Sequence, residues 1–146
     1  MGFKVFIDTD VIIDFLIDRQ PHAVASSRIF DLYDKEIITI FASSLCINNV
    51  HYIVKKVIGD KKAREIINDL LDLMTVIEVS EKDLRNAIQS NFKDFEDAIQ
   101  YSIAQKVSGI KAIVTRNTKD YKNSKIAIFT PDTLIKTIEN EQAQHL

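Results

Sequence analysis

The stretch KVFIDTDVIID, residues 4–14, decides the fold. Its first four residues are almost all strand formers, and from Val11 onward the apolar residues recur at helical spacing. A short strand therefore gives way to a helix at Asp8. Two further acids, Asp10 and Asp14, follow in the same stretch, so three carboxylates surround the end of the first predicted strand.

The same alternation of strand and helix continues along the chain. The predicted strands are apolar throughout rather than on alternate residues, which is typical of a parallel sheet covered on both faces. We therefore expect an α/β protein: a three-layer α/β/α sandwich around a central, mainly parallel sheet of about five strands. The predicted strands cover residues 4–8, 36–42, 75–79, 111–115 and 126–129.

Local signals mark several helix ends. Pro21 is expected near the start of the second helix, and Ser80 followed by Asp83 resembles a capping pair that opens another. A helix from about Asp94 carries apolar residues on one stripe, and Gly109 is expected to end it.

Composition limits the classes of protein to consider. A chain of 146 residues with 46% hydrophobic and 27% charged residues predicts one soluble domain, residues 1–140, followed by a polar C-terminal tail, residues 141–146. No apolar run reaches the roughly 18 residues needed to span a bilayer, and no secretory signal is apparent, so we expect a cytoplasmic protein without membrane contact.

The charge and glycine content also limit the possible ligands. The net charge of −2 argues against binding of nucleic acid by overall electrostatic attraction. Three glycines are too few for the usual nucleotide-binding glycine motifs.

Polar residues follow two of the predicted strands. Asp8 ends the first, and Thr115 and Arg116 end the strand at residues 111–115, with Asn117 and Asp120 close behind. In open α/β sheets, ligands bind beyond the carboxyl ends of the strands, where the strand order reverses. If these two strands are neighbours, their polar ends share one crevice.

The segment DFEDA, residues 94–98, adds Asp94 and Asp97 at the beginning of a helix. One interpretation is that Asp94 caps this helix and Asp97 lies in its first turn, where acids are common. Another is that both face the same crevice as Asp8. Asp8 or Asp10 could likewise serve as a helix cap, but a cap needs only one acid and the stretch supplies more.

Clustered carboxylates repel one another unless a cation neutralises them. Mg²⁺ prefers oxygen ligands, keeps several waters, and is typically held by one or two carboxylates plus substrate phosphate. Such an ion can polarise a phosphodiester and activate water, so no serine, cysteine or histidine nucleophile is required. The histidines have no metal-like spacing and are interpreted as surface or helix-flank residues: His22, His51 and His145.

Four segments together resemble, in order, the four blocks of the PIN-domain family. They read FIDTDVIIDFLIDRQP, SSLCINNVHYIV, DFEDAIQYSIA and IVTRNTKDY, and they span essentially the whole chain. Within that family the sequence is most similar to a bacterial group that carries DFEDA and is related to toxin ribonucleases of toxin–antitoxin operons. The resemblance implies an acidic Mg²⁺ or Mn²⁺ site that cleaves single-stranded RNA, a homodimer, and an antitoxin protein as partner.

The resemblance also implies roles for individual residues. Asp8 matches the family's first acid and Asp97 its third, so both are expected to bind metal. Asp94 is the additional acid of the DFEDA group and is expected to assist. Thr115 matches a hydroxyl residue of the fourth block.

Two positions depart from the family pattern, because Asn49 and Asn117 stand where acids are expected. An amide oxygen can bind a cation or its water but brings no charge. Asp120 or Asp94 could compensate, and Asp10 could restore a charge near Asp8. Each asparagine also has a structural interpretation: a buried amide bonded to backbone at position 49, and a turn residue at position 117.

The leading hypothesis is a metal-dependent ribonuclease, with Asn49, Thr115 and Asn117 orienting water or phosphate. Contact with RNA is predicted for Thr9, Asp10, Arg116 and Lys119, although the basic runs that include Arg116 and Lys119 are interleaved with acids and also fit an ordinary solvated surface.

Two alternatives remain from the sequence. A PIN-like module that has lost catalysis would bind RNA or a protein partner without cleaving. The pentapeptide DTDVI, residues 8–12, also resembles the motif of haloacid-dehalogenase-like phosphatases, in which Asp8 would be a phosphoryl nucleophile.

Overall fold

The computed structural model describes residues 2–144, and its centre is a sheet of five parallel strands in the order β3-β2-β1-β4-β5. Val5 of β1 pairs with Ile40 of β2 on one side and with Ala112 of β4 on the other. The predicted fold class is confirmed. The strands are β1 (Phe3–Ile7), β2 (Ile38–Ser43), β3 (Thr75–Ile77), β4 (Ala112–Val114) and β5 (Ala127–Phe129).

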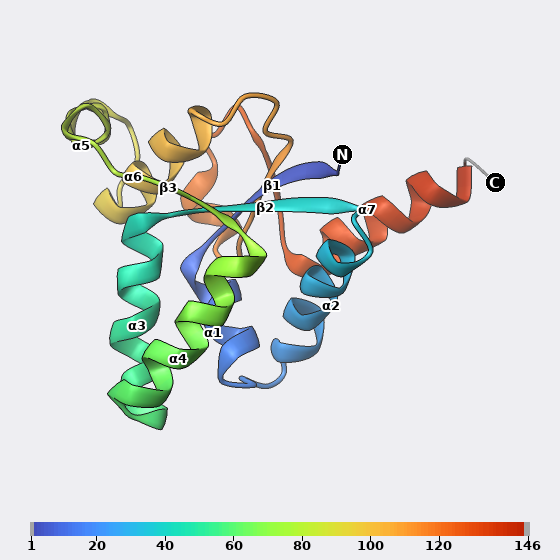
Figure 1. Cartoon of the computed structure of the whole chain (residues 1–146). Coiled ribbons are helices and arrows are strands. Elements are labelled where there is room, and N and C mark those ends of the chain that lie inside the picture. The colour runs from blue at the N-terminus through green and yellow to red at the C-terminus, as the bar shows by residue number, and fades with distance from the viewer. Residues whose placement is uncertain (1, 145–146) are drawn as a thin grey trace.

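Helices form the two outer layers. Figure 1 shows α5 and α6 on the opposite side of the sheet from α1, α3 and α4. None of the helices within residues 2–144 is long and apolar enough to cross a membrane. The helices are α1 (Thr9–Leu16), α2 (Ala23–Asp34), α3 (Ser44–Ile58), α4 (Asp60–Leu70), α5 (Glu81–Gln89), α6 (Phe95–Gln105) and α7 (Pro131–Gln144), with short 3-10 turns η1 (Leu71–Leu73) and η2 (Thr118–Tyr121).

Side chains of β1 enter both cores. Val5 and Ile7 pack in the larger core, under α1, α2, α3, α4 and α7, whereas Phe6 packs in the smaller core with α5 and α6. Successive strand residues point to opposite faces. A strand buried on both faces therefore needs an unbroken apolar run, which is the pattern that predicted the sandwich.

Some element ends differ from the prediction. α2 begins at Ala23, two residues after Pro21, and α6 ends at Gln105 rather than at Gly109. The amides of Lys106 and Val107 bond three residues back, which tightens the last turn before Gly109 takes its positive φ of 76°. α7 continues to Gln144, so residues 141–144 are helical; His145 and the rest of the predicted tail lie outside the described residues.

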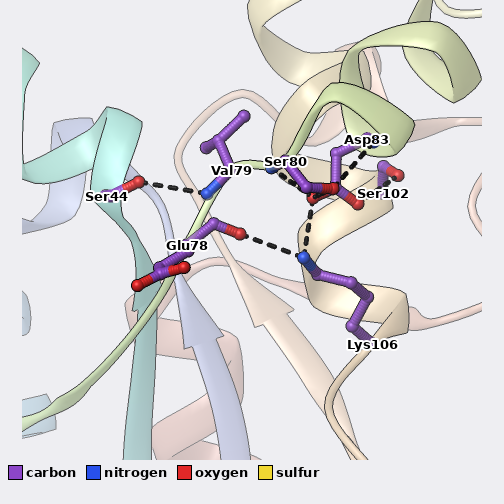
Figure 2. Close-up of polar contacts among 7 residues, drawn as sticks. All are labelled: Ser44, Glu78, Val79, Ser80, Asp83, Ser102 and Lys106. Atoms are coloured by element: carbon purple, nitrogen blue, oxygen red, sulfur yellow. Dashed lines mark hydrogen bonds and ion pairs between the residues drawn. The ribbon is translucent and has the colours of Figure 1, made fainter.

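A polar cluster around the buried Asp83 joins α5 to α6 (Figure 2). The Asp83 side chain accepts hydrogen bonds from the Ser80 amide at 2.8 Å and from Lys106 Nζ at 2.6 Å, and it completes the capping box predicted for this helix. Lys106 also donates to the Glu78 carbonyl at 3.0 Å, and Ser102 Oγ lies 3.3 Å from Asp83. Burial raises the pKa of Asp83, but these donors outweigh it, so the pKa lies below its usual value.

Asp83→Asn is expected to lower the free energy of unfolding at pH 7 by roughly 1.5–3 kcal/mol, because it removes hydrogen bonds to a charged group. A carboxyl whose folded-state pKa is lowered stabilises the fold above its unfolded pKa of about 4 and loses that contribution as the pH falls. Urea unfolding between pH 2.5 and 7 should show a weaker pH dependence in the variant. The control is Glu81→Gln, which breaks only an exposed pair with Arg85. Equal pH dependence in wild type and Asp83→Asn would contradict this account.

Candidate functional site

An acidic cavity of about 280 Å³ lies beyond the carboxyl ends of β1 and β4. These strands are neighbours, and the strand order reverses between them, as the crevice hypothesis required. The Asp8 amide donates to the Val114 carbonyl at 3.0 Å, which links the two strand ends. Six carboxylates line the cavity: Asp8, Asp10, Asp94, Glu96, Asp97 and Asp120.

Asp8 is the most buried of these acids, with 6% of its surface exposed. It caps α1 by accepting from the Thr9 amide at 2.8 Å, and Gln100 Nε2 lies 3.5 Å from the same oxygen. Its other oxygen accepts from Thr115 Oγ1 at 2.9 Å and from the Tyr121 hydroxyl at 3.3 Å. Burial raises the pKa of Asp8, and these bonds oppose that rise only in part. Four donors thus hold the carboxylate in one orientation.

Asp97, on the first turn of α6, lies close to Asp8. The Tyr121 hydroxyl is 3.3 Å from Asp8 and 3.5 Å from Asp97, so one donor lies between the two carboxylates. Burial, followed by the negative charges of Asp8 and Asp94, raises the pKa of Asp97 to about 7. Asp94 itself caps α6 through the Asp97 amide at 2.9 Å, as the capping interpretation predicted, and it also lines the cavity.

Asp10 and Thr9 line this cavity, and Asp10 Oδ1 is a buried oxygen without a hydrogen-bond partner in residues 2–144. The other Asp10 oxygen accepts from the Arg116 amide at 3.1 Å. Burial and the charge of Asp8 raise the pKa of Asp10 to about 6. Buried polar atoms are rarely left unpaired, so the Asp10 oxygen fits a site that takes a ligand.

Asn49 lies on α3 and donates from Nδ2 to Glu96 Oε1 at 2.8 Å. Glu96 lines the cavity, and burial together with the charge of Asp8 raises its pKa. Asn49 therefore acts on this site through Glu96. The amide bonds to a side chain, where the structural interpretation of Asn49 had expected backbone groups.

Three residues of the fourth family segment, residues 113–121, lie at the crevice: Thr115, Asn117 and Asp120. Thr115 is fully buried and, besides its bond to Asp8, accepts from the Asn117 amide at 3.0 Å. Asn117 and Asp120 line the acidic cavity, and Lys119 is exposed in an adjoining one.

Arg116 turns away from the acidic cavity toward Asp14, which is fully buried. Its Nε lies 2.7 Å from one Asp14 oxygen and its Nη2 lies 3.3 Å from the other, while Arg19 approaches at 3.6 Å. The three acids of residues 4–14 thus have separate places: Asp8 and Asp10 border the cavity, and Asp14 holds Arg116.

The donor set suits a hard divalent cation, although no three Asp, Glu, His or Cys side chains of residues 2–144 converge into a ready-made cage. Mg²⁺ is usually held by one or two carboxylates, with waters and substrate phosphate completing its shell. The Asp8 and Asp97 pair, the unpartnered Asp10 oxygen and the mutual repulsion of the acids fit that mode of binding.

Sequence reasoning placed Asp8, Asp94, Asp97, Asn117 and Thr115 in one region, and the structure brings them together. It missed Glu96, Gln100 and Tyr121. Glu96 stands between two acids that were singled out, which was a usable signal. Gln100 follows Asp97 by three residues on the same helix face, which was a weaker one. For Tyr121 the sequence offered none.

Comparisons with known proteins bear on the family of the chain and on its fold. The model of the PIN domain family matches residues 4–119. "Ribonuclease VapC1" from Aquifex aeolicus (strain VF5) is 30% identical over 134 residues, which is 88% of this chain and 91% of that protein.

Solved structures share the fold. One is titled "Toxin-antitoxin complex from Klebsiella pneumoniae": it is 21% identical, with a TM-score of 0.66 over 87% of this chain and 97% of that chain. VapC20 from Mycobacterium tuberculosis, titled a sarcin-ricin loop cleaving toxin, is 15% identical with a TM-score of 0.59 and covers 75% of this chain and 86% of its own.

Proposed function

The chain belongs to the PIN-domain family, and we propose that it is a divalent-metal-dependent ribonuclease that hydrolyses phosphodiester bonds of single-stranded RNA. The observation that carries this proposal is the crevice where Asp8, held by four donors, and Asp97 share the Tyr121 hydroxyl. The ribonuclease name of the relative from Aquifex aeolicus supports it. The family match leaves the phosphatase alternative without support.

Asp8 and Asp97 hold the cation, Mg²⁺ or Mn²⁺, with assistance from Asp94. When bound, such an ion supplies positive charge to the phosphodiester and lowers the pKa of bound water. Thr115 keeps the Asp8 carboxylate in place. Tyr121, whose pKa is raised by burial and then by the charge of Asp8, stays neutral and serves as a hydrogen-bond donor.

Glu96 supplies the acid that position 49 lacks. The Asn49 amide fixes Glu96 beside the cavity, so the negative charge comes from α6 instead of α3. In the same way, Asp120 provides a carboxylate next to Asn117, whose amide orients water or phosphate. On this account the two asparagines do not disarm the site.

RNA contacts fall to residues that line the two cavities. Thr9 and Asp10 line the acidic cavity, and Lys119 offers an exposed cation in the adjoining one. Arg116 positions α1 through its ion pair with Asp14. It contacts substrate only through the guanidinium N–H groups that this ion pair leaves free.

We propose further that the protein is a cytoplasmic toxin that forms a homodimer and binds an antitoxin protein. This is supported by the resemblance to the group that carries DFEDA, by the toxin–antitoxin title of the Klebsiella pneumoniae structure and by the toxin title of VapC20.

One alternative keeps a specific observation in its favour: Asn49 and Asn117 stand at two acid positions of the family, as in a module that binds RNA without cleaving it. The test is cleavage of an end-labelled single-stranded RNA in Mg²⁺, Mn²⁺ or EDTA. We expect metal-dependent cleavage that Asp97→Asn slows by about 10²-fold or more, equivalent to about 3 kcal/mol of transition-state stabilisation. Asp132→Asn, at an exposed acid of α7, is the matched control. Binding without cleavage by the wild type would favour the module instead.

A further inference from the structure

A second cavity, of about 380 Å³, adjoins the acidic one. It lies between residues 91–94, which precede α6, and residues 119–123, which include η2. Asp94 and Asp120 line both cavities, so they form the boundary between them. A polymer whose phosphate lies at Asp8 and Asp97 would therefore place a neighbouring unit in the second cavity.

The walls of this second cavity are basic. Lys93, Lys119 and Lys122 line it and are exposed. None of these lysines forms an ion pair with any residue of the described chain, although Asp94 and Asp120 line the same cavity. Three unpaired cations in one hollow of a protein with net charge −2 indicate a place for an anion.

Phe92 lines the floor of the cavity and connects it, through Tyr121, to the acidic site. The Phe92 ring stacks on Tyr101 with 4.9 Å between centroids and meets the Tyr121 ring edge-on at 5.8 Å. Tyr121 in turn reaches Asp8. Asn123 Nδ2 donates to the Asn91 carbonyl at 3.4 Å, which ties the two walls together. These contacts link the lining of this cavity to the carboxylates of the acidic one.

We propose that this cavity binds one nucleotide of the single-stranded RNA, next to the phosphate that is cleaved. The lysines contact its phosphate, the Phe92 floor provides an apolar surface for its base, and the asparagine side chain at position 123 offers polar groups at the rim. Basic side chains commonly hold the phosphates of nucleic acids, and the cavity volume lies in the usual range for small-molecule sites. This inference rests on the proposed function and assigns part of its substrate path.

The test measures the Kd of a fluorescent, uncleavable 2′-O-methyl single-stranded RNA for the full chain in EDTA at several salt concentrations. We expect the double variant Lys93→Ala/Lys122→Ala to bind at least tenfold more weakly and to lower the slope of log Kd against log salt by about 0.7, the contribution of one phosphate contact on a single strand. The control is Lys61→Ala/Lys62→Ala, which removes two exposed lysines of α4. It should keep the wild-type affinity within a factor of about two.

Three outcomes separate this inference from the ribonuclease proposal. Weaker binding in the cavity variant alone, with metal-dependent cleavage by the wild type, supports both. Unchanged binding in the cavity variant, while the wild type still cleaves RNA, overturns the nucleotide site and leaves the ribonuclease intact. A wild type that neither binds nor cleaves RNA overturns both.

Discussion

Asp8→Asn should slow RNA cleavage by about 10³-fold or more, and it should also raise the stability of the metal-free protein. The loss of activity follows because the variant removes the best-oriented carboxylate of the proposed metal site, and a contribution of about 4 kcal/mol to transition-state stabilisation corresponds to that factor. Initial rates of cleavage at saturating Mg²⁺ measure it.

The gain in stability has a separate cause. Burial raises the pKa of Asp8, so its charged form opposes folding at neutral pH. A group with a raised folded-state pKa contributes its stability at low pH and loses it as the pH rises through that pKa. The neutral amide avoids this cost and keeps a carbonyl that can accept from the Thr9 amide. Urea unfolding in EDTA at pH 7.5 should show a higher midpoint than wild type. A lower midpoint together with lost cleavage would mean that the variant damages the fold.

Arg116→Ala should lower the free energy of unfolding by about 3–5 kcal/mol. Asp14 is fully buried, and Arg116 provides its two shortest ion-pair contacts, at 2.7 and 3.3 Å. Removing one partner of a buried ion pair leaves an uncompensated charge, which is strongly destabilising. Arg19 lies farther away, at 3.6 Å, and compensates only in part. Equilibrium unfolding in urea measures the loss.

Two further variants separate the buried pair from a general effect of arginine. Arg28→Ala removes an exposed pair with Glu139 and should cost at most about 1 kcal/mol. The double variant Asp14→Leu/Arg116→Met replaces the pair by apolar side chains and should recover most of the lost stability. Similar losses for Arg116→Ala and Arg28→Ala would contradict the proposed role of Asp14.

The sequence predicted the fold and the place of the site because both follow from local patterns. Unbroken apolar runs separated by helical stripes predict a parallel sheet, and Asp8 and Thr115 end two of its strands. The rule that ligands bind where the strand order reverses then brings those ends together. The helix caps at Asp94 and Ser80 were equally predictable, since capping depends on a few consecutive residues.

What the sequence could not supply was the pairing between distant side chains. Tyr121 meets Asp8 across 113 positions of the chain, Asn49 meets Glu96 across 47, and Arg116 meets Asp14 across 102. These contacts depend on how the helices on the two faces of the sheet are placed relative to each other and on the path of the loop after β4. Hydrophobic periodicity predicts which side of each helix is buried, but it encodes neither of these. The role of Asn49 therefore depends on one contact between α3 and α6, which lie on opposite sides of the sheet, and no local pattern predicts that contact.

Calorimetric titration with Mn²⁺ and Mg²⁺, alone and with the uncleavable RNA, tests the central claim most directly. The claim is that the acidic crevice holds a divalent cation. We predict saturable binding that is lost in Asp8→Asn and in Asp97→Asn and is retained in Asp132→Asn. Binding that survives in both crevice variants, or no binding by the wild type even with RNA present, would contradict it.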